Sequence, residues 1–248
     1  MAKYILLDTE TTGTGELDRV IQLGFMVLGR PDEKPEIHNQ YCSSEQKIAF
    51  EAMEIHNITP EMISSEPTCI DSPAYKRLQE LNTNDNYLFI QNAPFDLGML
   101  KKEGFESHMQ LVDTLRCARH LFTELNSHRL QFMRYALEMY KTEKSVADTL
   151  GVDIKAHDAM GDVLVMKMLI SELTKKVREV YPSDKPMQKL VELTKQPVLI
   201  KTFKFGKYRG QDVADVASTD AGYLKWMLAN MKDLDEDMRY TLGRYVDS

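Results

Sequence analysis

Two short apolar runs in this chain each end abruptly in polar residues, and this pattern restricts the fold more than any other feature. The first run, Tyr4-Ile5-Leu6-Leu7, leads into Asp8, and the second, Tyr87-Leu88-Phe89-Ile90, leads into Gln91 and Asn92. Runs of four apolar residues are too short for helices and are typical of strands buried on both faces. The sequence therefore predicts two buried central strands with polar groups gathered where they end.

The spacing of Asp8 and Glu10 matters because side chains alternate between the two faces of a strand. Both carboxylates point the same way and Thr9 points the other way, so one cation or a close pair of cations can contact both acids. A solvated strand end is the simpler interpretation of an isolated Asp-x-Glu. The turn residues that follow, Thr11 to Gly15, predict a reversal into a second strand over roughly residues 19–29.

Two further acids are predicted at the starts of helices. Asn92 fits a helix N-cap with Pro94 in the first turn, which places Asp96 near the start of that helix. Negative charge there is favourable by about 0.3–1 kcal/mol, so Asp96 alone has a structural explanation. Asp162 is harder to explain, because the residues four, seven and eleven positions later are apolar and its carboxylate would face inward with them. A bound cation would compensate that charge.

His157 lies five residues before Asp162, about 140° around a regular helix, so it is predicted in the entering loop with Asp158 as the cap. A lone histidine usually has a structural role. Beside a metal cluster, however, an imidazole with a pKa near 6.5 is suited to accept a proton from water. Four acids and one histidine at strand ends and helix starts together indicate a two-metal phosphodiester hydrolase.

These motifs resemble those of the DnaQ-like, or DEDDh, family of 3′→5′ exonucleases. The matching segments are Leu7 to Gly13, Asn92 to Asp96 and the His157-x-Ala-x-x-Asp162 pattern, in the family's order and separation. The resemblance implies a ribonuclease H-like α/β fold, a mixed five-stranded sheet with helices on both faces, over residues 1–180. It also implies His157 as general base and two Mg²⁺ or Mn²⁺ ions held by Asp8, Glu10, Asp96 and Asp162.

Another segment extends the resemblance to substrate contacts. Residues Glu51 to Thr59 are similar to the family's His-Gly-Ile region, which borders the 3′-terminal nucleotide. The resemblance therefore implies substrate contacts by Glu51 and His56, together with Thr9 and Asn92.

Three other positions concern the surroundings of the site. Val112 to Leu115 is similar to a family segment with a structural role. Gln22 and Gln91 stand where many relatives have Glu and His. These two departures affect substrate contacts and local hydrogen bonds, and neither removes a predicted metal ligand.

The last part of the chain is predicted to form a separate module. Three prolines interrupt the helical pattern that follows Asp162, which predicts a linker over residues 181–196. Residues 197–248 are then predicted as a small α+β module, with a strand and turn over residues 201–210. Its Phe-Gly-Lys-Tyr-x-Gly and Tyr-Leu-x-Trp motifs resemble a module appended to exonuclease X-like proteins.

Basic and aromatic residues alternate in this module, and two interpretations stay open. In one, the basic side chains contact phosphates of a nucleic acid and the aromatic side chains stack on bases. In the other, the aromatic side chains form a small core and the basic side chains are solvated. The basic residues are Lys204, Lys207 and Arg209, and the aromatic residues are Phe203, Phe205 and Tyr208.

The formal net charge of −7 is unusual for an enzyme that acts on nucleic acid, whose phosphates attract positive charge. Positive charge is concentrated, however, since residues 175–209 hold ten Lys or Arg against three acids. No apolar segment reaches the roughly 18 residues of a membrane span, and the N-terminus shows no signal-peptide pattern. The 3 cysteines lack Cys-x-x-Cys spacing. We therefore expect a cytoplasmic enzyme with no membrane contact.

The resemblance predicts a 3′→5′ exonuclease that acts mainly on single-stranded DNA 3′ ends and releases nucleoside 5′-monophosphates. DNA repair or end trimming is the expected setting. The alternatives within this class are a 3′→5′ exoribonuclease, similar to ribonuclease T or oligoribonuclease, and a proofreading subunit of a DNA polymerase. An alternative from a different class is a non-catalytic nucleic-acid-binding scaffold.

Overall fold

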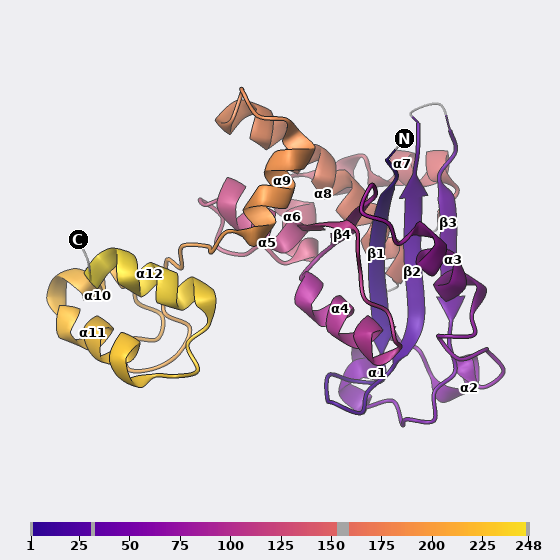
Figure 1. Cartoon of the computed structure of the whole chain (residues 1–248), viewed down its shortest axis with the longest axis horizontal. Coiled ribbons are helices and arrows are strands. Elements are labelled where there is room, and N and C mark those ends of the chain that lie inside the picture. The colour runs from indigo at the N-terminus through magenta and orange to yellow at the C-terminus, as the bar shows by residue number, and fades with distance from the viewer. Residues whose placement is uncertain (1, 31–32, 153–158, 247–248) are drawn as a thin grey trace. The chain divides into compact units, whose positions relative to one another are not determined.

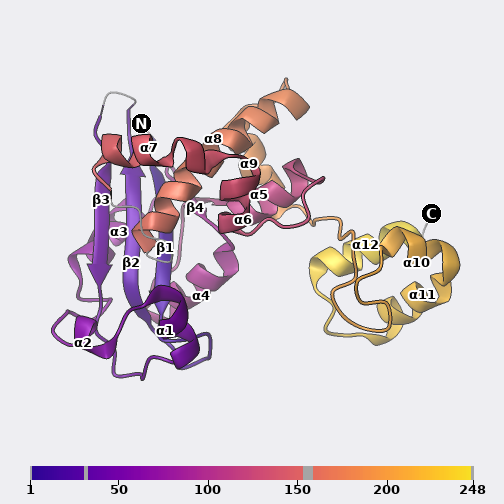
Figure 2. The ribbon, with the colours of Figure 1, turned by 180° about the vertical axis from the view of Figure 1, so that it is seen from behind.

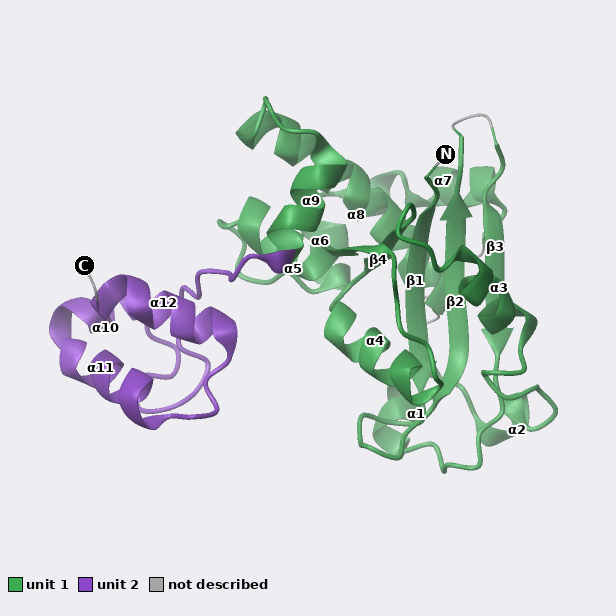
Figure 3. Cartoon of the chain, viewed as in Figure 1, with its two compact units in different colours: residues 1–194 green, residues 195–248 purple. Residues whose placement is uncertain are grey.

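The protein consists of two compact units, Met1–Thr194 and Lys195–Ser248, in a computed structural model (Figures 1 and 3). The structure describes residues 2–30, 33–152 and 159–246. Each unit buries its own set of apolar side chains, two large clusters on the sheet of unit 1 and a smaller cluster in unit 2. The units are therefore described separately.

Unit 1 is built on a mixed five-stranded sheet with the strand order β3-β2-β1-β4-β5. β2 is antiparallel to both of its neighbours, β1 and β3, whereas β4 is parallel to β1 and β5. The strands are β1 Tyr4–Thr11, β2 Val20–Leu28, β3 Glu36–Tyr41, β4 Tyr87–Ile90 and β5 Gln110–Asp113. The two apolar runs of the sequence are thus neighbouring central strands. β3 has no counterpart among the predicted strands, because an edge strand is only half-buried and its sequence is largely polar.

Helices cover both faces of the sheet, as predicted. On one face, α3 Pro73–Leu81 and α4 Ala93–Lys102 pack against the odd-numbered apolar residues of β1 (Figure 1). Figure 2 shows the opposite face of the sheet. Leu6, an even-numbered residue of β1, belongs to a second cluster on that face. The helices on that side are α5 Thr114–Leu121, α6 Leu130–Ala136, α7 Glu143–Leu150, α8 Ala159–Val180 and α9 Pro186–Lys195.

The remaining helices of unit 1 are short. They are α1 Phe50–His56, α2 Pro60–Ile63 and the 3₁₀ turn η1 Met139–Lys141. Unit 2 contains α10 Val213–Thr219, α11 Ala221–Asn230 and α12 Glu236–Val246. Among the described residues, none of the helices combines the length and the apolar character that a membrane span requires.

The predicted linker over residues 181–196 is wrong for most of its length, because α9 occupies residues 186–195. Pro186 is the first residue of this helix, a position where the missing N–H of proline costs no hydrogen bond. Leu190 and Leu193 are fully buried in the cluster beneath α8. A proline that ends one helical pattern can therefore begin the next helix, and here the packed part of unit 1 continues to Thr194.

The predicted α+β character of the C-terminal module is also wrong for the described residues. In place of the predicted strand, the structure has a loop with one isolated bridge between Thr202 and Asp212, followed by three helices. Gly206 and Gly210 take left-handed φ values of 76° and 87°, and they turn the chain before a strand can extend. Phe203 is 1% exposed and lies in the core of this unit.

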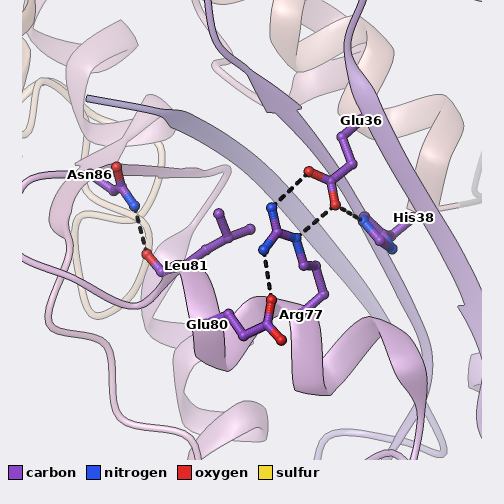
Figure 4. A network of polar contacts seen from close by, with 6 residues as sticks. All are labelled: Glu36, His38, Arg77, Glu80, Leu81 and Asn86. Atoms are coloured by element: carbon purple, nitrogen blue, oxygen red, sulfur yellow. Dashed lines mark hydrogen bonds and ion pairs between the residues drawn. The ribbon is translucent and has the colours of Figure 1, made fainter. Parts of the chain in front are cut away.

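An ion-pair network attaches the edge strand β3 to α3 (Figure 4). Arg77 donates from Nε and Nη2 to the two carboxylate oxygens of Glu36, at 2.7 and 3.0 Å, and from Nη1 to Glu80 at 2.7 Å. His38 adds a contact of 2.8 Å to Glu36, and its ring stacks on Phe25 with centroids 4.4 Å apart. The Arg77 guanidinium holds the pKa of Glu36 at about 2.

We expect Glu36→Gln to lower the free energy of unfolding at pH 7 by about 1 kcal/mol, because solvent screens this partly exposed pair. The pKa of Glu36 is lowered in the folded state, so the stabilisation is complete above the unfolded value near 4.5 and is lost as the pH falls toward 2. Urea titrations at pH 7 and at pH 3 measure this difference. Glu80→Gln is the control, since this more exposed partner of Arg77 should cost less; equal stabilities of wild type and Glu36→Gln at pH 7 would contradict the prediction.

Candidate active site

β1 presents Asp8 and Glu10 on the face of the sheet that α8 covers. In the pairing of β1 with β2, Asp8 lies opposite Gly24 and Glu10 lies opposite Gln22. Residues directly opposite each other in an antiparallel pair share a face, and Leu6 of the same face belongs to the cluster beneath α8. Both acids are half-buried. The strand thus directs two carboxylates toward the start of α8.

The first turn of α8 lies directly against these strands. An added Cβ at Gly24 would be 2.7 Å from the Cβ of Ala159, so only glycine lets the helix approach this closely. The backbone N–H of Ala159 also donates a long hydrogen bond of 3.5 Å to Oε1 of Gln22. Asp162 follows in the same first turn of α8. This turn packs against Gly24 and Gln22, the β2 residues that pair with the two acids of β1.

Asp96 reaches β1 from the other face of the sheet. Its Oδ1 accepts hydrogen bonds from the backbone N–H of Thr9 at 3.0 Å and from the Thr9 hydroxyl at 2.7 Å. Asp96 is 3% exposed. Burial raises the pKa of Asp96 to about 7, against the opposing effect of the hydrogen bonds from Thr9. Asp96 is therefore bonded to the residue that separates Asp8 from Glu10 in β1. A cation would stabilise the charged form of Asp96.

The start of α4, which carries Asp96, is fixed by Asp113 at the end of β5. The carboxylate of Asp113 accepts the N–H groups of Asn92 and Ala93 at 3.3 and 3.1 Å, and those of Leu115 and Arg116 at 2.9 and 3.2 Å. One buried acid thus caps α4 and α5 together. Asn92 is the N-cap residue of α4, in a left-handed conformation, but its own side chain makes no capping hydrogen bond. It is exposed at the helix start.

Asp162 is held by a residue that the sequence analysis did not identify. Gln131, in α6, donates from Nε2 to Oδ1 of Asp162 at 2.7 Å. The loop that enters α6 is fixed in turn by Gln91, which donates to the carbonyl of His128 at 2.9 Å and accepts from the Thr114 hydroxyl at 2.5 Å. A glutamine in a helix is a common surface residue, and only the packing of α6 against α8 reveals this contact. Gln91, which stands where many relatives have His, therefore has a structural role.

α1 carries the other two residues predicted to contact substrate. His56 is buried, and its Nδ1 accepts from the N–H of Ile58 at 2.9 Å while its Nε2 contacts the carbonyl of Thr11 at 3.2 Å. Burial lowers the pKa of His56, which favours the neutral ring. Both ring nitrogens contact the main chain, so His56 holds α1 against the end of β1. Its contact with substrate stays a prediction. Glu51, by contrast, is exposed.

The remaining predictions for the site have different outcomes. His157 and Asp158 lie outside the described residues. Across the described ranges, no three His, Cys, Asp or Glu side chains are grouped in a way that could hold a metal ion. The carboxylates of Asp96 and Asp162 instead accept hydrogen bonds from Thr9 and Gln131. The basic residues predicted to contact nucleic acid, Lys204, Lys207 and Arg209, are exposed in unit 2.

The comparisons with known proteins define the class. Residues 5–169 match the family model described as Exonuclease, which covers more than half of the chain, and residues 203–232 match the Exodeoxyribonuclease X-like C-terminal model. The chain therefore belongs to the exonuclease family, as its motifs predicted. Members of this family are nucleases that depend on divalent metal ions.

The relatives agree with this class over nearly the whole chain. Exodeoxyribonuclease 10 of Escherichia coli (strain K12) is 28% identical, over 98% of this chain and 98% of its own length. A solved structure of exonuclease X with 5′ overhanging duplex DNA has a TM-score of 0.51 at 17% identity and covers 77% of this chain and 99% of that chain. E. coli exonuclease I with a dT13 oligonucleotide has a TM-score of 0.52 at 19% identity, over 73% of this chain and 43% of that chain. The ribonuclease H-like fold is thereby confirmed.

We expect Gly24→Ala to disturb the site more than the fold. The new Cβ would also lie 3.0 Å from the carbonyl carbon of Ala159, so the start of α8 must shift, at a cost of about 1–3 kcal/mol. Because Asp162 moves with that turn, nuclease activity on a labelled oligonucleotide should fall by about 10- to 100-fold.

Gly98→Ala is the matched control, because a Cβ at this exposed position of α4 meets open space. It should leave activity unchanged and stabilise the protein by up to about 1 kcal/mol. Full activity of Gly24→Ala, with a melting temperature like that of wild type, would show that the close approach of α8 does not position the site.

Proposed function

We propose that this chain is a 3′→5′ exodeoxyribonuclease that acts mainly on single-stranded DNA, with two Mg²⁺ or Mn²⁺ ions held by Asp8, Glu10, Asp96 and Asp162. The observation that supports the proposal is the pair of hydrogen bonds from Thr9 to Asp96, which attach an acid of α4 to the residue between the two acids of β1. The full-length similarity to an exodeoxyribonuclease supports the choice of substrate.

The four proposed ligands fit divalent ions in chemistry and in charge. Carboxylate oxygens are the ligands that Mg²⁺ and Mn²⁺ prefer. Two like charges about 4 Å apart repel by about 4 kcal/mol at an effective dielectric constant near 20, so four clustered carboxylates require positive charge among them. Burial raises the pKa of Asp96, so a cation beside it would stabilise the charged form that the proposed site needs. When bound, such ions lower the pKa of a bound water and stabilise the departing 3′ oxygen.

The residues of the chain have distinct proposed roles in this reaction. His157 accepts a proton from the attacking water as the general base. Attack on phosphorus breaks the bond to the 3′ oxygen of the preceding nucleotide, so a nucleoside 5′-monophosphate leaves and a new 3′ hydroxyl remains. Glu51 and Asn92, both exposed, border the 3′-terminal nucleotide, and Thr9 keeps Asp96 in place beneath it.

The proposed setting is DNA repair or end trimming in the cytoplasm. Cys42, Cys69 and Cys117 are buried and form no disulfide, which fits a reducing compartment. An exoribonuclease or a proofreading subunit would use the same catalytic residues, so the substrate decides among the three. A non-catalytic scaffold would bind nucleic acid without cleaving it.

We expect 5′-labelled single-stranded DNA to give a descending ladder of products with Mg²⁺, and weaker cleavage of duplex DNA and RNA of matched sequence. Asp8→Asn should lower turnover by at least about a thousandfold, because it removes a proposed metal ligand while keeping the side-chain shape. Glu54→Gln, an exposed acid of α1, is the control and should be fully active. Cleavage only within the strand, or preferential cleavage of RNA, would contradict the proposal; binding without cleavage would favour a scaffold.

We expect Gln131→Ala to raise the Mg²⁺ concentration that gives half-maximal activity by about tenfold, because the hydrogen bond that orients Asp162 is lost. Activity should largely recover at saturating Mg²⁺, which separates positioning of a ligand from general destabilisation. Gln188→Ala, an exposed glutamine of α9, should leave the Mg²⁺ dependence unchanged. An identical Mg²⁺ titration for Gln131→Ala and wild type would refute this role.

A further inference from the structure

Unit 2 carries a set of stacked aromatic rings that extends from its core to solvent. Tyr223 and Trp226, on the same side of α11, stack with ring centroids 5.9 Å apart and an interplanar angle of 22°. The rings of Tyr208 and Tyr223 lie at 80° to each other with centroids 5.0 Å apart, and both pack near the buried Phe203. Trp226 is 52% exposed. We call Tyr208, Tyr223 and Trp226 the aromatic platform.

A lysine is fixed over this platform. Nζ of Lys207 lies 4.6 Å from the ring centroid of Tyr208 and 5.8 Å from that of Tyr223. Asp220 accepts from Lys207 Nζ at 3.1 Å and from the Tyr208 hydroxyl at 2.6 Å, and it also caps α11 through the N–H of Tyr223. The Lys207 side chain is still 62% exposed. One carboxylate therefore orders a cation and two rings while the cation remains accessible.

The loop that carries the basic residues 201–209, called the basic loop, contacts the aromatic platform at Tyr223. Gly206 has a φ of 76°, and an added Cβ there would lie 2.6 Å from the hydroxyl of Tyr223, while the N–H of Lys207 donates to that hydroxyl at 3.3 Å. The basic residues of this loop are all exposed, and no acid occurs in the sequence between Glu192 and Asp212. They are Lys201, Lys204, Lys207 and Arg209.

We propose that the aromatic platform and the basic loop form a second binding surface, which holds single-stranded nucleic acid through bases stacked on Trp226 and phosphates contacted by the loop. Aromatic rings beside a cationic strip are the combination that binds single strands without sequence preference. Protein interfaces, in contrast, are depleted of lysine. A duplex hides its base faces, so it cannot stack on Trp226. The surface lies in a unit that contains none of the proposed metal ligands, and it goes beyond the proposed hydrolysis.

The aromatic residues named in the two interpretations differ in their exposure. Phe203 fills the core and cannot stack on a base, which corrects that part of the prediction. Tyr208 bonds to Asp220 and is partly buried. Phe205 of the basic segment is 37% exposed, so a stacking role for it stays a prediction, and Trp226 of the Tyr-Leu-x-Trp motif is more exposed still. The basic residues at the edge and the aromatic core are thus parts of one surface.

The experiment uses the intrinsic fluorescence of the full chain, because Trp226 is its only tryptophan. Oligo(dT) of 20 nucleotides is titrated into the protein with EDTA present, so that no cleavage occurs. We expect tryptophan emission to be quenched in step with binding measured by anisotropy of a labelled strand. A 20-base-pair duplex should leave the emission unchanged. Quenching reports contact at Trp226 itself, independent of catalysis.

Variants then measure the contribution of each part. Trp226→Ala should weaken binding of oligo(dT) by about 5- to 100-fold, since one base stack contributes about 1–3 kcal/mol, and Trp226→Phe should restore most of the affinity. Lys207→Gln should reduce the slope of log affinity against log salt by about 0.7, the value for one phosphate of a single strand. Tyr240→Ala and Lys232→Gln, exposed positions elsewhere in unit 2, are the matched controls and should bind like wild type.

Emission that stays constant while anisotropy reports binding would overturn the proposal, and so would unchanged affinity of Trp226→Ala. Either result would leave a protein partner as the occupant of the platform. Circular dichroism of each variant guards against unfolding, and the Lys207→Gln slope provides a second measurement that leaves the rings intact. Because none of these readouts requires cleavage, failure of this surface and failure of the proposed nuclease chemistry are distinguished.

Discussion

The burial of Asp96 against Thr9 is the constraint on which the candidate site depends. A carboxylate that is 3% exposed is costly unless hydrogen bonds or a cation compensate it, and the N–H and hydroxyl of Thr9 supply two hydrogen bonds. Those bonds attach α4, from one face of the sheet, to the central strand whose acids point to the other face. Thr9, the residue between the two acids of β1, thereby connects α4 to the central strand. A cation would stabilise this arrangement further.

Close packing sets the position of the remaining acid. Gly24 lets Ala159 approach the strand, and Gln131 then fixes the carboxylate of Asp162 from a third helix. Three different physical causes thus position the acids of the site. They are strand alternation for Asp8 and Glu10, buried hydrogen bonds for Asp96, and helix packing for Asp162. These causes depend on separate regions of unit 1, which is why the motifs can be so far apart in the sequence.

These causes also explain what the sequence predicts and what it does not. Asp8 and Glu10 are predictable because strand alternation is local, and the apolar run of β4 is as clear in the sequence as in the structure. The contacts of Gln131 and Gln22 depend on how α6 and α8 pack, and no local pattern contains that information. Proline both ends and begins helices, so Pro186 does not distinguish a linker from the start of α9 in the sequence. Trp226 was missed as a candidate site residue because exposure, and not residue type, distinguishes it from a core aromatic.

Charge distribution reconciles an acidic chain with a polyanionic substrate. Residues 195–248 contain nine Lys or Arg and eight acids, a net charge of +1, so the remainder of the chain carries −8. Two divalent ions would bring four positive charges to the region of the four proposed ligands, which neutralises the charge that would otherwise repel phosphates. The basic loop of unit 2 needs no metal, since its acids follow the loop instead of interrupting it. Metal concentration should therefore control binding at the two surfaces differently. The effect should be strong at the carboxylates, whose charge the ions neutralise, and weak at Trp226, where stacking adds a contribution that salt screens little.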